Sequence, residues 1–203
     1  RVIGVDPTAD MLAQAQAIPH PPEIEFHSGD SAASGLADGC ADIVTVSQAL
    51  HWMDPFPTFQ EARRILRPGG VFAAFDYDWP PQVMDAECES AYEQTMRRVR
   101  AAEKTRGAEV FQWPKDGHLG RMLQSGCFAY GRETALHHAD QGSAERLVAL
   151  LISQGGTAGL LRRGMSEEEL GIAAFRALCR ARLGDTQQPW FWTSRLRLGV
   201  RGA

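Results

Sequence analysis

Four short strand-like segments in the first 75 residues constrain the fold of this chain most strongly. They lie at residues 2–5, 24–27, 43–46 and 71–75. The first, third and fourth are apolar at nearly every position, which is typical of strands buried on both faces of a parallel sheet. Apolar residues at helical spacing fill residues 8–18 and 59–66 between them. This alternation predicts an α/β fold with a doubly wound, mostly parallel sheet.

Small and polar residues follow each of these segments. Crossovers between parallel strands are right-handed, so the carboxyl ends of all four strands share one edge of the sheet, and ligands bind at that edge. The residues expected there are Asp6, Gly29, Asp30, Ser31, Ser47, Gln48, Asp76 and Tyr77. Asp6 directly follows its apolar strand, so its carboxylate is placed to accept the two hydroxyls of a cofactor ribose.

The second half of the chain is predicted to be mostly helical. A long helix is expected over residues 84–106 and another around residues 147–151. Ser166 and Glu169 have the spacing of a capping box that opens a further helix. In residues 192–201, apolar side chains alternate with threonine and arginine. This period of two predicts an antiparallel strand at the edge of the sheet with one face in water.

Composition excludes several classes of function. The net charge is −4, which argues against a nucleic-acid partner that relies on a broad basic surface. No stretch of about 18 apolar residues is present, so no membrane partner or membrane span is expected. The four cysteines are far apart and form no metal or disulfide pattern, which favours a cytoplasmic location. The sequence shows no signal peptide and begins with Arg1, which suggests a truncated or processed start.

Several motifs occur together in a fixed order along the first 80 residues. They are Gly4-Val5-Asp6-Pro7-Thr8 with Met11, Gly29-Asp30-Ser31-Ala32, Ala41-Asp42-Ile43-Val44, Gln48-Ala49-Leu50-His51-Trp52, and Glu61-Ala62-Arg63-Arg64-Ile65-Leu66-Arg67-Pro68-Gly69-Gly70. With this set the chain resembles a class I S-adenosylmethionine-dependent methyltransferase. It is most similar to the small-molecule subgroup that includes trans-aconitate methyltransferase. The resemblance implies a Rossmann-like fold, in one domain over residues 1–203. Residues 1–80 would be its cofactor-binding half, and residues 81–203 would supply helical substrate-side segments and the last strands.

The resemblance implies that S-adenosylmethionine is the cofactor and assigns its adenosine contacts. Asp6 would accept the ribose hydroxyls, since a carboxylate offers two acceptor oxygens. Pro7 or Met11 would lie on the adenine face. Asp30 would accept from the adenine amine, and the backbone N–H of Ser31 would meet a ring nitrogen.

The methionine part of the cofactor would lie near Ser47 and Gln48. The family also has a first strand with a glycine-rich loop, about 20 residues before the acidic residue. No such segment is found before Asp6 in this sequence. We therefore expect an N-terminally truncated sheet and impaired cofactor binding.

Methyl transfer needs positioning, exclusion of water and in some cases a base. His51 is the expected catalytic base, because it follows a strand end and its ordinary pKa suits the task. The alternative is that His51 and Trp52 form a structural pair that closes the pocket, with Trp52 as a wall for the substrate. Tyr77 is expected on the substrate side. Asp76 could serve as a base or hold a metal, but a solvated loop is the simpler reading, and no metal site is predicted.

The sequence therefore predicts an enzyme that transfers a methyl group from S-adenosylmethionine to a small-molecule acceptor. Two alternatives stay open. Asp6 alone is also compatible with an NAD(P)-dependent oxidoreductase, although no catalytic set of that class is visible. The missing strand is also compatible with a non-catalytic relative that binds a partner. Neither the acceptor nor the oligomeric state follows from the sequence.

Overall fold

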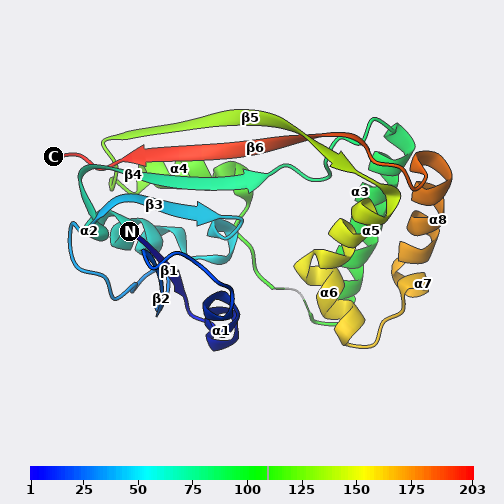
Figure 1. Ribbon diagram of the computed structural model, residues 1–203, viewed down its shortest axis with the longest axis horizontal. Coiled ribbons are helices and arrows are strands. Elements are labelled where there is room, and N and C mark those ends of the chain that lie inside the picture. The colour runs from blue at the N-terminus through cyan, green and yellow to red at the C-terminus, as the bar shows by residue number, and fades with distance from the viewer. Residues whose placement is uncertain (109) are drawn as a thin grey trace. The chain divides into compact units, whose positions relative to one another are not determined.

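The chain folds into two compact units, each assembled from segments that are distant in sequence (Figure 1). The computed structural model describes residues 1–108 and 110–203. The first unit contains Arg1–Asp76, Gln112–Thr134 and Leu196–Ala203. The second contains Tyr77–Phe111 and Ala135–Arg195.

The structure confirms the alternation of strands and helices in the first third of the chain. The elements there are β1 (Val2–Asp6), α1 (Ala9–Ala17), β2 (Ile24–Ser28), β3 (Ala41–Ser47), the 3-10 helix η1 (Leu50–Trp52), α2 (Pro55–Ile65) and β4 (Leu66–Tyr77). The later elements are α3 (Ala86–Thr105), η2 (Lys115–Gly117), α4 (His118–Gln124), β5 (Tyr130–Gly142), α5 (Ala144–Ser153), α6 (Gly155–Arg162), α7 (Glu167–Leu170), α8 (Ile172–Leu183) and β6 (Gln188–Val200).

The strands of the first third pair in parallel, as expected. β1 pairs with β2 so that Asp6 lies opposite Ser28, and β3 pairs with β4 so that Ser47 lies opposite Phe75. The hydrogen-bonded strands form two sheets rather than one. β1 and β2 make a two-stranded sheet, and the other sheet has the order β3-β4-β6-β5. The mostly parallel α/β prediction therefore holds, but its strands are divided between two sheets.

The last strand is antiparallel but does not lie at an edge. The backbone of Arg201 bonds to Gly69 and Gly70, and further along the backbone of Thr193 bonds to Asp78, which is an antiparallel progression. The prediction of an edge strand is wrong, because β6 lies between β4 and β5 and the edge belongs to β5. β5 has thirteen residues and contains His137 and His138, where a strand was expected.

α2 begins and ends where its sequence dictates. The Asp54 side chain accepts from the Phe56 N–H and Pro55 occupies the first turn, a favourable N-terminus. The helix ends at Ile65, and Leu66 is already extended. Gly69 and Gly70 therefore do not cap the helix. Gly69 instead has a φ of 74° within the first part of β4, where four residues separate the paired positions Leu66 and Val71.

The core of the first unit is a cluster of three phenylalanines. Phe59 on α2 meets Phe72 on β4 with their rings 5.6 Å apart in a T-shaped arrangement. Phe72 also stacks on Phe128, which precedes β5, at 5.5 Å. Phe59 and Phe72 are fully buried. Aromatic pairs at these distances add to the hydrophobic stabilisation from burial. The cluster therefore packs α2 against β4.

The second unit is mostly helical, as predicted, with α3 and α5 to α8 gathered together (Figure 1). Its buried core includes Tyr92, Leu147, Phe175 and Trp190. The capping box of Ser166 and Glu169 is present in both directions. The helix that it opens stops after one turn because Gly171 is left-handed, with a φ of 78°, and α8 then begins.

Candidate functional site

The carboxyl ends of β1 and β2 bring Asp6 and the Asp30 loop together, as the sequence predicted. Asp6 is half-buried, and its Oδ1 accepts the Thr8 N–H at 2.8 Å. Asp30 is exposed, and its Oδ1 accepts the N–H groups of Ala32 at 2.7 Å and Ala33 at 2.9 Å. One oxygen of each carboxylate thus shapes its own loop. The other oxygen makes no hydrogen bond with the described residues, so it is available to a ligand.

Pro7 and Met11 are exposed near Asp6. Pro7 follows Asp6 directly, and Met11 lies in the first turn of α1 with 52% of its surface exposed. Ser31 is half-buried and its hydroxyl accepts from Thr58 Oγ1 at 3.0 Å. This bond joins the loop after β2 to α2, the helix that contains Thr58.

The carboxyl ends of β3 and β4 hold Ser47 and Gln48. Gln48 has a φ of 50°, and its N–H donates to the Phe75 carbonyl at 2.9 Å. A positive φ at a residue other than glycine is uncommon and costs free energy unless the surroundings hold it. Lys115 Nζ donates to Gln48 Oε1 at 3.1 Å, while Gln48 Nε2 is buried without a partner in the described structure.

His51 is buried beside an acidic residue at the end of β4. Its Nδ1 lies 3.6 Å from Asp76 Oδ1, and 7% of the residue is exposed. The His51 carbonyl accepts the Trp113 N–H at 2.8 Å, which fixes η1 to the segment before η2. A carboxylate next to Nδ1 favours the tautomer with its proton there and leaves Nε2 as the nitrogen that can take a proton.

Asp76 is the centre of a buried charge network. Arg197 Nη1 donates to Asp76 Oδ2 at 2.7 Å, and Arg197 Nε donates to Glu133 Oε2 at 2.7 Å. Lys115 Nζ lies 3.2 Å from Asp76 Oδ1. Burial alone would raise the pKa of Asp76, but His51, Lys115 and Arg197 outweigh burial and lower that pKa to about 2. Asp76 therefore stays ionised.

Two predictions fail at this network. The reading of Asp76 as part of a solvated loop is wrong, because its carboxylate is 3% exposed. The wet face assigned to the last strand is wrong for Arg197, which is 1% exposed. Asp76 lies within β4 rather than in a loop, and Arg197 on β6 donates to Asp76 of β4 and to Glu133 of β5.

His118 extends the polar cluster. Arg121 Nη2 lies 3.0 Å from His118 Nδ1, and arginine can only donate, so Nδ1 is the unprotonated nitrogen. Burial, followed by the positive charges of Arg121 and Arg197, lowers the pKa of His118 to about 4. His118 Nε2 is buried without a partner in the described part of the chain.

The structure does not bring all predicted residues to one place. The Trp52 ring lies at a tilt to the His51 ring with centroids 5.0 Å apart, and 48% of Trp52 is exposed. Tyr77 belongs to the second unit, where it packs on Trp192 at 5.0 Å. Sequence reasoning missed Lys115, His118 and Arg197. A lysine after the Trp113-Pro114 step gave no local signal, because its partner is 39 residues away in the chain.

The fold and the motifs agree with comparisons to known proteins. Residues 1–74 match the family model described as a methyltransferase domain. An uncharacterized methyltransferase of Mycobacterium tuberculosis is 39% identical over 69 residues, which cover 34% of this chain and 28% of that protein. An uncharacterized 37.1 kDa protein of a Streptomyces fradiae transposon is 37% identical over 87 residues, 42% of this chain and 25% of that protein.

The fold likeness extends beyond residues 1–74. A solved structure from Anaeromyxobacter dehalogenans, provisionally named a type II methyltransferase, aligns with a TM-score of 0.67 at 22% identity. The alignment covers 98% of this chain and 80% of that one. The two curated relatives are matched over only about a quarter of their length. No described helix is long and apolar enough to cross a membrane.

Proposed function

We propose that this chain transfers a methyl group from S-adenosylmethionine to a small-molecule acceptor. The observation that carries the proposal is a methyltransferase domain whose strand ends hold Asp6 and, on a neighbouring pair of strands, a buried His51 beside Asp76. The same domain match favours methyl transfer over the oxidoreductase reading. The small-molecule acceptor, a single domain over residues 1–203 and a cytoplasmic location are parts of this proposal.

The residues at the strand ends fit the cofactor. Asp6 keeps one carboxylate oxygen free for ribose hydroxyls, and Asp30 keeps one for the adenine amine. Pro7 and Met11 present apolar surface beside Asp6. Gln48 Nε2 is a buried donor without a partner in the described structure, and it is available to a carboxylate such as that of a methionine moiety.

S-adenosylmethionine supplies, when bound, a methyl group already activated on a sulfonium. The chain then has to bind and orient the cofactor and the acceptor, and to remove a proton from the acceptor. His51 takes the acceptor's proton at Nε2, and Asp76 holds the imidazole by its Nδ1 side and stabilises the charged form. Arg197 and Lys115 keep Asp76 ionised, so that it can do this at neutral pH. Trp52, in the same unit as His51, is proposed to contact the acceptor.

We infer that cofactor affinity is reduced in this chain. β1 pairs only with β2, and β3 only with β4, among the described strands. Val2 and Ile43 on these strands are 59% and 61% exposed, although strands of a parallel sheet are normally covered on both faces. α1 buries none of its residues. The strand ends that carry Asp6 and Ser47 are therefore held less firmly than in a continuous sheet.

The proposal is tested by transfer of a tritiated methyl group. The chain is incubated with millimolar tritiated S-adenosylmethionine and a pool of small molecules, and label is counted in the small-molecule fraction. Asp6→Asn removes one charged acceptor and should lower transfer about tenfold or more. Asp10→Asn, an exposed carboxylate on α1, is the matched control and should change nothing. Label no higher than a protein-free blank, or equal label with Asp6→Asn, contradicts the proposal.

A further inference from the structure

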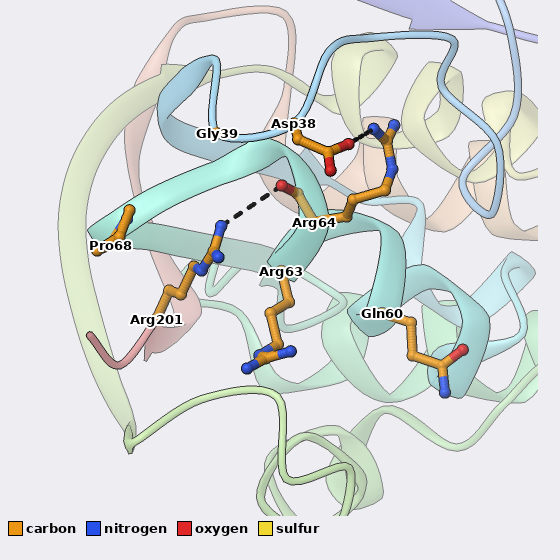
Figure 2. Close-up of a pocket in the computed structure, with 7 residues that line it drawn as sticks. All are labelled: Asp38, Gly39, Gln60, Arg63, Arg64, Pro68 and Arg201. Carbon is orange, nitrogen blue, oxygen red and sulfur yellow. Dashed lines mark hydrogen bonds and ion pairs between the residues drawn. The ribbon is translucent and has the colours of Figure 1, made fainter.

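A hollow of about 400 Å³ lies in the first unit (Figure 2). Its lining comes from the start of β4, the end of α2, the loop before β3 and the C-terminal tail. The residues are Asp38, Gly39, Gln60, Arg63, Arg64, Pro68 and Arg201. The candidate catalytic residues lie at the carboxyl ends of β3 and β4, whereas this lining lies at the amino ends of these strands and at the end of β6. The hollow is thus a separate feature.

The lining carries an excess of positive charge. It holds three arginines and one carboxylate among the described residues. The carboxylate, Asp38, already accepts from Arg64 Nη1 at 2.5 Å. Arg64 is also bound to both oxygens of Glu61, through Nε at 2.8 Å and Nη2 at 2.8 Å. Arg64 is therefore neutralised, and the excess charge comes from the other two arginines.

Arg63 and Arg201 have no carboxylate partner within the described part of the chain. Arg63 is exposed and makes no hydrogen bond there. Arg201 is half-buried, and its Nη1 donates to the Leu66 carbonyl and lies 3.4 Å from the Arg64 carbonyl. These bonds fix the position of the Arg201 guanidinium. Its Nε and Nη2 donate no hydrogen bond to the residues that the structure describes. A fixed guanidinium loses little freedom when it binds an anion.

The end of α2 does not oppose an anion at this place. The last carbonyls of a helix carry partial negative charge when they are unpaired. Here the Arg64 carbonyl accepts from the Gly39 N–H at 3.0 Å and also from Arg201, and the Ala62 carbonyl accepts from the Leu66 N–H. Figure 2 shows the Arg64 carbonyl turned toward Arg201. The negative end of the helix is thus covered by donors.

We propose that this hollow binds the phosphoryl group of a small phosphate monoester through Arg63 and Arg201. Guanidinium groups bind phosphate oxygens through paired, charge-assisted hydrogen bonds. Gln60 on the same rim adds an amide. The volume is in the range of small-molecule sites, which runs from roughly 300 to 1,000 Å³, so it admits an organic group beside the phosphate. The chain as a whole carries a charge of −4, so this local positive charge is not a general property of the surface.

Calorimetric titration of the full chain tests the proposal with inorganic phosphate and with phenyl phosphate, at constant ionic strength set with chloride. We expect saturable binding of both, with phenyl phosphate the tighter of the two. Arg63→Gln should weaken both about tenfold, because one charge-assisted pair is lost. Arg163→Gln in the second unit is the matched control, since Arg163 is also exposed, and should leave both affinities within twofold.

Arg201 also holds the end of α2, so Arg201→Lys is used beside Arg201→Gln. Arg201→Lys keeps the charge but loses the paired donors, and it should weaken binding while the chain stays folded by circular dichroism. The proposal is overturned if neither probe binds saturably at millimolar concentration. It is equally overturned if Arg63→Gln binds as the unchanged chain does, or if Arg163→Gln weakens binding as much as Arg63→Gln.

Discussion

At the level of single residues, the candidate base His51 lies beside a network of charged side chains. His51 Nδ1 lies 3.6 Å from Asp76, and Asp76 is bound by Arg197, whose Nε is bound to Glu133. A buried ion pair contributes little net stability, but removal of one partner typically costs about 3–5 kcal/mol because the other charge stays buried. The network therefore fixes where the charges of the site lie, and its integrity is a condition for the proposed role of His51.

His118 predicts how stability depends on pH. Its pKa is about 4 in the folded chain against an ordinary value of 6.5. As the pH falls below 6.5, His118 is protonated in the unfolded chain but stays neutral in the folded chain, so the free energy of unfolding decreases. The loss is complete near pH 4 and amounts to roughly 3 kcal/mol. Urea unfolding at several pH values measures it, and His118→Asn, which does not titrate, should abolish this part of the pH dependence.

His20→Asn is the control for this measurement, because His20 is an exposed histidine in the same unit. The free energy of unfolding of the His20→Asn variant should equal that of the unchanged chain at every pH. Parallel stability curves for the unchanged chain and His118→Asn between pH 7 and pH 4 would show that His118 is not held neutral in the folded state.

At the level of secondary-structure elements, β5 and β6 of the second unit approach each other closely at Gly142 and Trp190. Trp190 on β6 is fully buried and lies against Gly142 at the end of β5. A Cβ at Gly142 would come within 2.1 Å of the indole ring, closer than any real contact. Gly142→Ala is therefore expected to destabilise the chain by about 1–3 kcal/mol or more, measured by thermal unfolding.

Gly120 on α4 gives the matched comparison. A Cβ there meets nothing within 4 Å. Gly120→Ala should raise stability by up to about 1 kcal/mol, since alanine is the better helix former. If both alanine variants changed stability in the same direction by the same amount, the close packing of Trp190 on Gly142 would be wrong.

Elements with local signals were predictable from the sequence. β1 and β3 were visible as apolar runs, and the capping box of Ser166 and Glu169 formed as expected. The place of β6 between β4 and β5 was not, because strand order is set by pairing between distant residues. The same holds for the site. Asp6 and His51 were found from their position after strands, whereas the partners Lys115 and Arg197 come from segments that only the fold brings to Asp76.

Each of the two units has its own core at the scale of the whole molecule. The phenylalanine cluster belongs to the first unit, and the cluster around Tyr92 and Trp190 belongs to the second. The proposed cofactor residues Asp6, Asp30 and Gln48 all lie in the first unit. The account therefore predicts that the first unit binds the cofactor, and that the division of its parallel strands between two sheets weakens this binding.

The most direct test is an NMR titration of the isotopically labelled chain with millimolar S-adenosylmethionine. The account predicts weak binding, with amide shift changes concentrated after β1 and β2, at Asp6 and Asp30, and after β3 at Gln48, and with none at Arg63 or Arg201. Asp6→Asn should remove these changes and Asp10→Asn should keep them. Absence of any shift change, or changes confined to residues away from these strand ends, would contradict the central claim.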